Sequence, residues 1–389
     1  MFYISSEDDI KNGKTTDIYF ERTYKILKAK KINPKVKVEI FLKGFPNNYS
    51  WGVLSGVEES LKLLASIPGI TVKCLPEGTV FKNLEPVMVI EGNYLDFGKY
   101  ETPILGFLCH SSGISTKAAR CKLAAGDKLV YNFGARRVHP AITPMVERCA
   151  FIGGLDGVST IAGAEAIGEK PVGTMPHALV LIIGDTVKAT DFFNEIIEKT
   201  VKRISLIDTL GDEKFEAIKV CEFMGKALYG VRLDTPASRR GSFKRILEEV
   251  RWELNIRGFK NVKLMVSGGL DESDIIDLKY IADAFGIGTS ISGARVLDFS
   301  LDIVEINGKK IAKKGKMSGA KKVLRCKKCF IDEVVLEEEI ASKYACSNCN
   351  GSLEDIFVDA IINGKMLYNF PSTHEIRERV LSQFNYLEL

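Results

Sequence analysis

Apolar and polar residues follow two different patterns along this chain of 389 residues. Within positions 1–110, the alternating run 36–41 predicts a strand, and the helical spacing of apolar residues at 54–64 predicts a helix. Pro and Gly separate two further strand-like runs, at 71–81 and 85–94. Residues 1–110 therefore indicate a mixed α and β region.

A second pattern begins after a helix that is predicted to open at Pro103 and to end before Gly126. Short apolar runs, most of them ending in Gly, Asp, Thr or Arg, alternate there with helical stretches such as 191–203 and 241–256. This alternation predicts a parallel sheet of βα units, and about seven units fit an α/β barrel. An open doubly wound sheet is the alternative, and either fold binds ligands at the carboxyl ends of its strands. The runs are 129–137, 151–160, 171–180, 204–212, 229–238, 262–270 and 285–292.

The alternation of strands and helices stops after Leu297. Residues 301–315 predict a hairpin with Asn307-Gly308 at its turn, and we expect this hairpin to rejoin the first sheet. The expected division is therefore an N-terminal α/β domain at 1–110 completed by 298–325, an α/β barrel catalytic domain at 111–297, and a zinc-binding C-terminal domain at 326–389.

Composition narrows the class of protein. Hydrophobic residues make up 46% of the chain, enough to bury a full core. The net charge of +4 does not indicate a nucleic-acid or membrane binder. The longest apolar run, 178–183, is far shorter than the roughly 20 residues that span a bilayer, and the N-terminus resembles no signal peptide. We expect a cytoplasmic protein.

Four of the nine cysteines form two CxxC pairs. Sixteen residues separate the pairs, a spacing typical of a four-cysteine zinc site. Four protein ligands fill a tetrahedral site, so the expected Zn²⁺ is structural. Two redox pairs are the alternative interpretation. The residues are Cys326, Cys329, Cys346 and Cys349.

Two strand ends carry turns suited to phosphate. Ser267, Gly268 and Gly269 follow one apolar run, and Gly286, Gly288 and Thr289 follow the next. Glycines let backbone N–H groups approach a phosphate, and a following helix adds the positive end of its dipole. Ordinary tight βα turns are the alternative. No P-loop or Rossmann glycine motif is present.

Charged residues end several of the other runs. Arg232 and Asp234 share a face if their segment is extended. Arginine binds carboxylates and phosphates, and aspartate holds Mg²⁺ or ribose hydroxyls, so the set indicates a phosphorylated, anionic substrate. Structural ion pairs at the barrel mouth are the alternative. The other members are Arg136, Arg137, Asp156 and Asp208.

His177 is one of only four histidines and lies near the expected end of an apolar strand at 171–180. It is a candidate base, acid or phosphate acceptor, and a structural histidine is the alternative.

The motifs LPEGTVF, EPVMVIEG, SSGISTKAAR, FGARR, GTMPHAL, VRLDT and VSGGL, in this order, resemble the nicotinate phosphoribosyltransferase family of the type II phosphoribosyltransferases. The resemblance covers roughly residues 15–310. It implies an N-terminal α+β domain packed on an irregular α/β barrel, in a homodimer or higher oligomer with shared active sites. It also implies that nicotinate and 5-phosphoribosyl 1-diphosphate react, with Mg²⁺, to nicotinate mononucleotide and diphosphate in NAD biosynthesis, coupled to ATP hydrolysis through a phosphorylated histidine.

The resemblance also implies roles for individual residues. Tyr19 of a partner subunit and Phe133 stack on nicotinate, Arg136 anchors nicotinate or the phosphoribosyl group, and Thr174 lies near the substrate carboxylate. His177 matches the phosphorylated histidine. The family's residues around the ribose and diphosphate correspond here to Asp156, Arg232 and Asp234. The family's residues that surround the 5-phosphate correspond here to Ser267, Gly268, Gly269, Gly288 and Thr289. The four-cysteine tail is not a general family feature, so the resemblance assigns it no role.

Two rival functions remain. Quinolinate phosphoribosyltransferase shares the SSGIST-like segment, but quinolinate carries two carboxylates and this chain lacks that enzyme's Thr-Arg-Lys-Thr motif. A zinc-ribbon nucleic-acid-binding protein is the rival from another class. The small net charge predicts at most weak, salt-sensitive nucleic-acid binding, so we expect no nucleic-acid partner.

Overall fold

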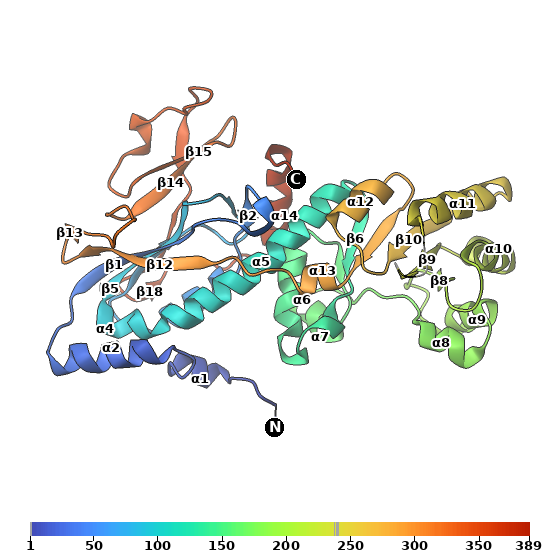
Figure 1. Ribbon diagram of the computed structural model, residues 1–389, viewed down its shortest axis with the longest axis horizontal. Coiled ribbons are helices and arrows are strands. Elements are labelled where there is room, and N and C mark those ends of the chain that lie inside the picture. Colours follow the sequence, from blue (N-terminus) through green and yellow to red (C-terminus); the bar gives the residue numbers. More distant parts are fainter. Residues whose placement is uncertain (1, 237, 239–240) are drawn as a thin grey trace. The chain divides into compact units, whose positions relative to one another are not determined.

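The computed structural model describes residues 2–236, 238 and 241–389, and the chain forms two compact units. The first unit comprises the chain up to Thr116 together with Arg295–Glu388, and the second comprises Lys117–Ala294 with Leu389. Residues 326–388 therefore belong to the first unit, whereas the sequence suggested a domain of their own. Figure 1 gives the course of the chain.

The first unit is built on a seven-stranded sheet in the order β13-β12-β1-β5-β3-β17-β18. All of its strand pairs are antiparallel. The predicted hairpin is confirmed: Asn307 and Gly308 both have positive φ, and β12 rejoins the sheet by pairing with β1. The strands are β1 (Lys35–Leu42), β3 (Thr71–Cys74), β5 (Pro86–Asn93), β12 (Phe299–Ile306), β13 (Lys309–Lys310), β17 (Val358–Ile362) and β18 (Lys365–Met366).

Helices pack on this sheet through its apolar residues. Val38 and Ile40 of β1 and Leu61 and Leu64 of α3 belong to one buried cluster. The helices are α1 (Glu7–Lys11), α2 (Ile18–Ala29), α3 (Val57–Leu64), α4 (Tyr94–Phe97), α5 (Glu101–Ala125) and α14 (Thr373–Gln383), with short turns η1 (Pro46–Asn48), η2 (Gly98–Tyr100), η6 (Ala341–Lys343) and η7 (Phe384–Tyr386). The bounds of α5 agree with the helix predicted from Pro103 to Gly126.

Two small sheets complete the first unit. One pairs β2 (Gly52–Val53) with β4 (Val80–Phe81), and the other has the order β15-β14-β16. Arg325 of β14 joins them: its guanidinium binds the buried Asp332 carboxylate at 2.7 and 2.8 Å and donates to the Val80 carbonyl at 2.7 Å. The strands of the second sheet are β14 (Lys321–Cys326), β15 (Asp332–Leu336) and β16 (Leu353–Asp355).

The second unit carries a parallel sheet of six strands in the order β7-β6-β11-β10-β9-β8. Strands that follow one another in the chain pair, except β7 and β8, and β6 pairs with β11. This is the cyclic order of a barrel that is open between β7 and β8. The α/β architecture is thus confirmed. The strands are β6 (Leu129–Asn132), β7 (Gly157–Val158), β8 (Ile204–Leu206), β9 (Gly230–Leu233), β10 (Lys263–Ser267) and β11 (Ala284–Ile287).

The prediction of a strand at 171–180 is wrong. Residues 171–176 form no regular element, and α8 begins at His177. The strand predicted at 171–180 would have followed β7 and preceded β8, which are the two consecutive strands that do not pair. The other elements of this unit are η3 (Ala135–Arg137), η4 (Pro140–Ile142), α6 (Thr143–Ile152), α7 (Ile161–Ile167), α8 (His177–Ile183), α9 (Thr186–Ile196), α10 (Glu213–Met224), η5 (Gly225–Ala227), α11 (Phe243–Ile256), α12 (Glu272–Leu278) and α13 (Thr289–Ser292).

Within the described residues, no helix combines the length and the apolar character that crossing a membrane requires.

Candidate active site

Arg232 is the centre of a polar cluster at the carboxyl end of β9. Its Nη2 lies 3.4 Å from Oδ2 of Asp234, as expected for residues two apart on one face of a strand, and its Nη1 donates to the Thr174 hydroxyl at 2.5 Å. Burial lowers the pKa of Arg232, and the positive charge of Arg136 also lowers it. The negative charges of Asp234 and Asp208 act in the opposite direction and raise it. Arg232 thus connects Thr174, in the segment before α8, with Asp234 at the end of β9.

Asp208, just beyond β8, supports this cluster. Its Oδ2 accepts from the backbone N–H of Asp234 at 2.9 Å and lies 3.3 Å from the Thr235 hydroxyl, which donates to Glu213 at 2.8 Å. Burial raises the pKa of Asp208, and the Asp234 charge adds to the rise, while His177 opposes it. Two carboxylates therefore meet at the ends of adjacent strands, where a cation would relieve their repulsion.

His177 is held between these strand ends as the first residue of α8. Its Nδ1 lies 2.9 Å from the Thr209 hydroxyl, and its Nε2 lies 3.5 Å from Oδ2 of Asp234. The side chain keeps 40% of its exposure. The histidine thus belongs to the cluster although it comes from a helix and not from the strand that the apolar pattern suggested.

The glycine turn after β10 approaches the same cluster. Gly268 has a φ of +98°, and a Cβ there would lie 2.8 Å from the Asp234 carbonyl oxygen, so only glycine fits. Ser267 donates its hydroxyl to Oδ1 of Asp234 at 2.7 Å. A Cβ added at Gly269, which has a φ of +71°, would meet no atom within 4 Å, so there is open space beside this part of the turn.

Phe133 forms an aromatic wall beside the turn after β11. A Cβ at Gly286 would lie 2.4 Å from the Phe133 ring, so this glycine makes room for it. The guanidinium carbon of Arg232 lies 5.9 Å from the centroid of the ring. Gly288 directly precedes α13, of which Thr289 is the first residue. A flat ring and an arginine thus border the open glycine turns.

Three buried polar atoms at this edge lack a hydrogen-bond partner among the described residues. They are Nδ2 of Asn132 at the end of β6, Oδ1 of Asp208 and Nε of Arg232. Buried polar atoms are normally satisfied, and exceptions gather where a ligand supplies the missing partner. Their common position indicates a site for a polar ligand.

Three further predicted residues are Asp156, Arg136 and Tyr19. Asp156 binds Lys122 at 2.8 Å and accepts from the backbone N–H of Val130, at the amino-terminal side of β6. Arg136 is exposed in η3, near enough for its charge to act on Arg232. Tyr19, 54% exposed, is in α2 of the first unit.

Sequence reasoning gave Asp208 no definite role and missed Thr209 and Asn132. Asp208 and Thr209 follow β8 directly, so the rule that parallel strands end at one edge was the signal that could have grouped them with Asp234. Asn132 ends β6 in the same way. No pattern in the sequence shows that Thr209 faces His177, because that contact depends on where α8 begins.

Cys326 ends β14, Cys329 lies in the turn that leads to β15, and Cys346 and Cys349 lie in the segment between η6 and β16. Their Sγ atoms are all within 4.8 Å of one another, with Cys326–Cys349 at 3.5 Å and Cys329–Cys346 at 3.4 Å. A tetrahedral metal site with metal–sulfur distances of ~2.3 Å places its sulfurs roughly 3.8 Å apart. The backbone N–H of Ile331 lowers the pKa of the Cys329 thiol to about 6. The cluster is compatible with zinc.

Two protein-family models match this chain. The N-terminal domain of quinolinate phosphoribosyl transferase matches residues 17–112, and its C-terminal domain matches residues 114–302. Together they span β1, β3, β5 and the start of β12 in the first sheet, and the whole parallel sheet with its polar cluster. A nicotinate phosphoribosyltransferase of Bacillus subtilis is 31% identical over 223 residues, 56% of this chain and 44% of that protein. The chain spans about half the length of the curated relatives it matches most strongly.

Solved structures extend the likeness to the whole chain. The nicotinate-nucleotide pyrophosphorylase of Pyrococcus furiosus is 54% identical, covers 100% of this chain and 99% of its own, and superposes with a TM-score of 0.96. The human nicotinic acid phosphoribosyltransferase, 18% identical with a TM-score of 0.73 over 96% of this chain and 94% of its own, shares the fold. With both domain models matched in order and the likeness extending over the full chain, the protein belongs to the quinolinate phosphoribosyltransferase family, among the type II phosphoribosyltransferases.

Proposed function

We propose that this protein is a nicotinate phosphoribosyltransferase. It joins nicotinate to 5-phosphoribosyl 1-diphosphate and releases nicotinate mononucleotide and diphosphate, a reaction of NAD biosynthesis. The observation that carries the proposal is the position of Arg232 at 5.9 Å from the Phe133 ring, beside Thr174 and the glycine turns. A flat acid and a sugar phosphate are the two chemistries that this arrangement suits.

Nicotinate binding uses the ring and the cation together. The pyridine stacks on Phe133, and its carboxylate takes hydrogen bonds from Arg232 and Thr174, with Arg136 nearby. Tyr19 of a second copy of the chain covers the other face of the ring in a homodimer or higher oligomer. The exposure of Tyr19 supports this assignment, because a stacking ring must be available to another subunit.

The phosphoribosyl group binds at the ends of β10 and β11. Backbone N–H groups of Gly268, Gly269 and Gly288 surround the 5-phosphate, with the Thr289 hydroxyl as a further donor. Ser267 acts through Asp234, to which it donates at 2.7 Å, and does not itself need to meet the phosphate. Asp234 faces the ribose.

Bond breaking at the anomeric carbon follows from these positions. The C–O bond to diphosphate breaks as the pyridine nitrogen forms the new C–N bond, through a transition state with positive charge on the ribose. The Asp234 carboxylate stabilises that charge, and Arg232 holds nicotinate in line. Asp208, with its unpartnered Oδ1, and Asp234 would hold Mg²⁺, which neutralises the leaving diphosphate when bound. Asp156, occupied by Lys122, is given no role at the ribose.

The proposal includes ATP coupling through His177. The γ-phosphoryl group of ATP passes to a ring nitrogen, ADP leaves, and water later hydrolyses the phosphohistidine. The support is its place between Thr209 and Asp234 with one nitrogen facing the carboxylates that would bind Mg²⁺. A phosphoryl group there adds about −1.5 to −2 charges beside the diphosphate site.

The cysteine cluster is proposed to bind one structural Zn²⁺, and the protein to work in the cytoplasm. Metal analysis of the purified protein should give one zinc per chain, and Cys346→Ser should lose it. Retention of zinc by Cys346→Ser would contradict this assignment.

The test of the proposed function is a steady-state assay with nicotinate, quinolinate and nicotinamide side by side, each with and without ATP. We expect nicotinate mononucleotide from nicotinate, little turnover of nicotinamide, and more product per enzyme when ATP is present. Turnover confined to nicotinamide would refute the role of the arginine. Nicotinate turnover with no ATP consumed would remove the coupling alone.

Quinolinate phosphoribosyltransferase is the second candidate. Both matched domain models describe quinolinate phosphoribosyl transferase. Quinolinate has a second carboxylate, and Arg136, near Arg232, offers a second cation to bind it. Its reaction releases carbon dioxide, so carbon dioxide formed from quinolinate in the same assay would establish it.

A further inference from the structure

A second polar pocket lies at the opposite edge of the parallel sheet. It is bordered by α11 and by the segment 280–283 and has a volume of about 460 Å³. Lys263 begins β10 and Asp283 directly precedes β11, so the pocket is at the amino ends of the two strands whose carboxyl ends carry the glycine turns. The pocket is therefore separate from the candidate active site. Its volume is within the roughly 300–1,000 Å³ range of small-molecule sites.

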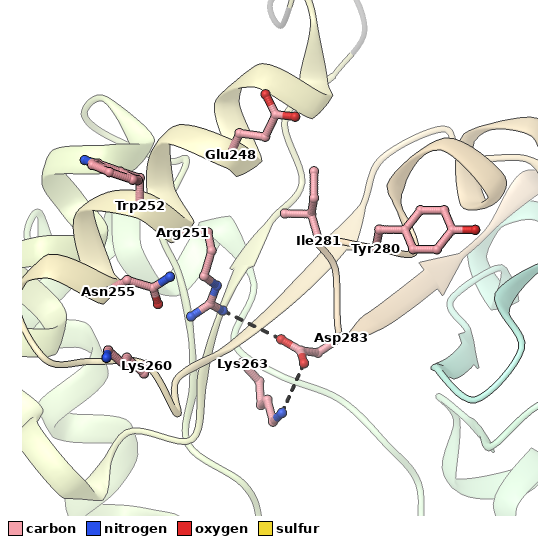
Figure 2. Close-up of a pocket in the computed structure, with 9 residues that line it drawn as sticks. All are labelled: Glu248, Arg251, Trp252, Asn255, Lys260, Lys263, Tyr280, Ile281 and Asp283. Carbon is pink, nitrogen blue, oxygen red and sulfur yellow. Dashed lines mark hydrogen bonds and ion pairs between the residues drawn. The ribbon is translucent and has the colours of Figure 1, made fainter.

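Two exposed aromatic rings flank this pocket. Trp252 of α11 is 66% exposed and Tyr280 is 85% exposed. Figure 2 shows them on opposite sides with their rings directed outward, Arg251 and Asp283 between them, Lys260 and Lys263 below, and Glu248 above. Large rings are expensive to leave in water, and a ligand with a flat ring would cover one of them.

Positive charge collects on the floor of the pocket. Asp283 pairs with Lys263 at 3.0 Å and lies 3.7 Å from Nη2 of Arg251. Nη1 of Arg251 is buried with no partner among the described residues, and in Figure 2 it is on the side of Asn255 and Lys260. Lys260 is exposed and has no ion pair within the described part of the chain. Two carboxylates line the pocket beside the three cations, and one of them, Glu248, accepts from Arg245 outside it at 3.0 Å. Asp283 thus serves two cations, and Lys260 is left over for an anion.

We propose that this pocket is a second ligand site that binds a nucleotide, with the base on Trp252 and the phosphate monoester on Lys260 and Arg251. A ring beside an unpaired lysine and an arginine with an unpartnered N–H group is the chemistry that recognises an aromatic group carrying a phosphate. Because β10 and β11 connect the pocket to the phosphate turns, the site is suited to regulation by a nucleotide. The proposal does not depend on which pyridine acid the active site uses.

Trp252 allows a direct test. The chain has only two tryptophans, and the other, Trp51, is 2% exposed in the first unit, so quenching by a ligand in the pocket reports on Trp252. The full-length protein is titrated with AMP and, separately, with nicotinate mononucleotide, while the tryptophan fluorescence is recorded. We expect saturable quenching by at least one of them. The ligand that binds more tightly shows whether the site prefers an adenine nucleotide or a pyridine nucleotide. Adenosine has the base but no phosphate, and inorganic phosphate has no base. Each should therefore bind at least tenfold more weakly than the nucleotide.

Variants assign the signal to the pocket. Lys260→Ala should weaken nucleotide binding at least tenfold, while Lys244→Ala, an exposed lysine of α11 outside the pocket, should bind as the unaltered protein does. Trp252→Phe should lose the quenching and bind more weakly by calorimetry. Arg232→Ala should leave the quenching intact, because that residue is at the other edge of the sheet. No quenching by either nucleotide, equal binding of inorganic phosphate, or equal losses in Lys260→Ala and Lys244→Ala would overturn the proposal.

Discussion

At the scale of single residues, the candidate site depends on a few side chains that bind one another but leave some of their hydrogen-bonding atoms without a partner. Arg232 meets Thr174 and Asp234 yet keeps its Nε unpartnered, and Asp208 binds the backbone of Asp234 yet keeps Oδ1 unpartnered. The Arg232–Asp234 pair was predictable from the sequence, because residues two apart in a strand share a face. The contact of His177 with Thr209 was not, because it depends on two segments that no local pattern connects.

Replacing Arg232 by Ala tests the carboxylate contact. A charged hydrogen bond contributes about 1.5–3 kcal/mol, so kcat/KM for nicotinate should fall about 10- to 100-fold. Nicotinamide has no carboxylate, and its smaller turnover should change less. An equal loss for both substrates would mean that the arginine serves the fold or the phosphoribosyl group, and circular dichroism of the variant separates these two cases.

Replacing Thr209 by Val tests the positioning of His177. The hydroxyl that faces Nδ1 at 2.9 Å would be lost while the shape of the side chain is kept. We expect the imidazole to be less well oriented, so that phosphohistidine formed from ATP, measured with radiolabelled ATP, falls about tenfold, in proportion to a lost hydrogen bond of about 1 kcal/mol or slightly more. The rate measured without ATP should fall less. An equal fall of both rates would indicate a purely structural threonine.

At the scale of elements, strands were recognised more reliably than their ends or their order. The apolar runs that became β6, β8, β9, β10 and β11 were identified because each is short and bounded by turn residues. The run 171–180 was misassigned, since a short apolar stretch fits a buried strand or a helix face equally well. Here Pro176 precedes the first helical residue, and the apolar run 178–183 continues α8. The barrel order opened between β7 and β8 is a long-range property that no local pattern contains.

The turn after β10 gives a prediction at this scale. Gly268→Ala adds a Cβ 2.8 Å from the Asp234 carbonyl oxygen and forces alanine into a φ of +98°. We expect a loss of about 1–2 kcal/mol in the free energy of unfolding and a raised KM for 5-phosphoribosyl 1-diphosphate. Gly126→Ala is the matched control, because Gly126 also has a positive φ, +62°, but no atom within 4 Å of the added Cβ. If both variants raise this KM alike, the turn does not bind the phosphate.

At the scale of the whole molecule, the chain returns to its first sheet twice. The return of β12 was predicted from the Asn307-Gly308 hairpin, but the pairing of β17 with β3 was not. The cysteine spacing suggested a separate domain, because it is a local pattern that contains nothing about the strands that follow. Where the cysteine-bearing sheet meets the rest of the first unit, Arg325 and Asp332 are buried together, and Glu85 is buried close to them.

Glu85 should make the stability of the protein depend on pH. Burial raises the pKa of Glu85 to about 7, with the Asp332 charge adding to the rise. A carboxyl whose pKa is higher in the folded state binds more protons there, so the free energy of unfolding should fall as the pH rises from about 4.5 to 7. Glu85→Gln removes this effect and should be more stable than the unaltered protein at pH 8 by about 1–3 kcal/mol.

Urea unfolding of both proteins between pH 4 and 8 measures this difference. The two stabilities should converge toward pH 4, where Glu85 is protonated in both states. Stability curves that remain parallel over the whole range would show that Glu85 does not titrate in this window.

The most direct test of the central claim is a crystal structure of the protein with nicotinate mononucleotide bound. We predict the pyridine on Phe133 with its carboxylate at Arg232 and Thr174, and the 5-phosphate at Gly268, Gly269, Gly288 and Thr289. A mononucleotide bound away from the carboxyl edge of the parallel sheet, with Arg232 still engaged only by Thr174 and Asp234, would contradict it.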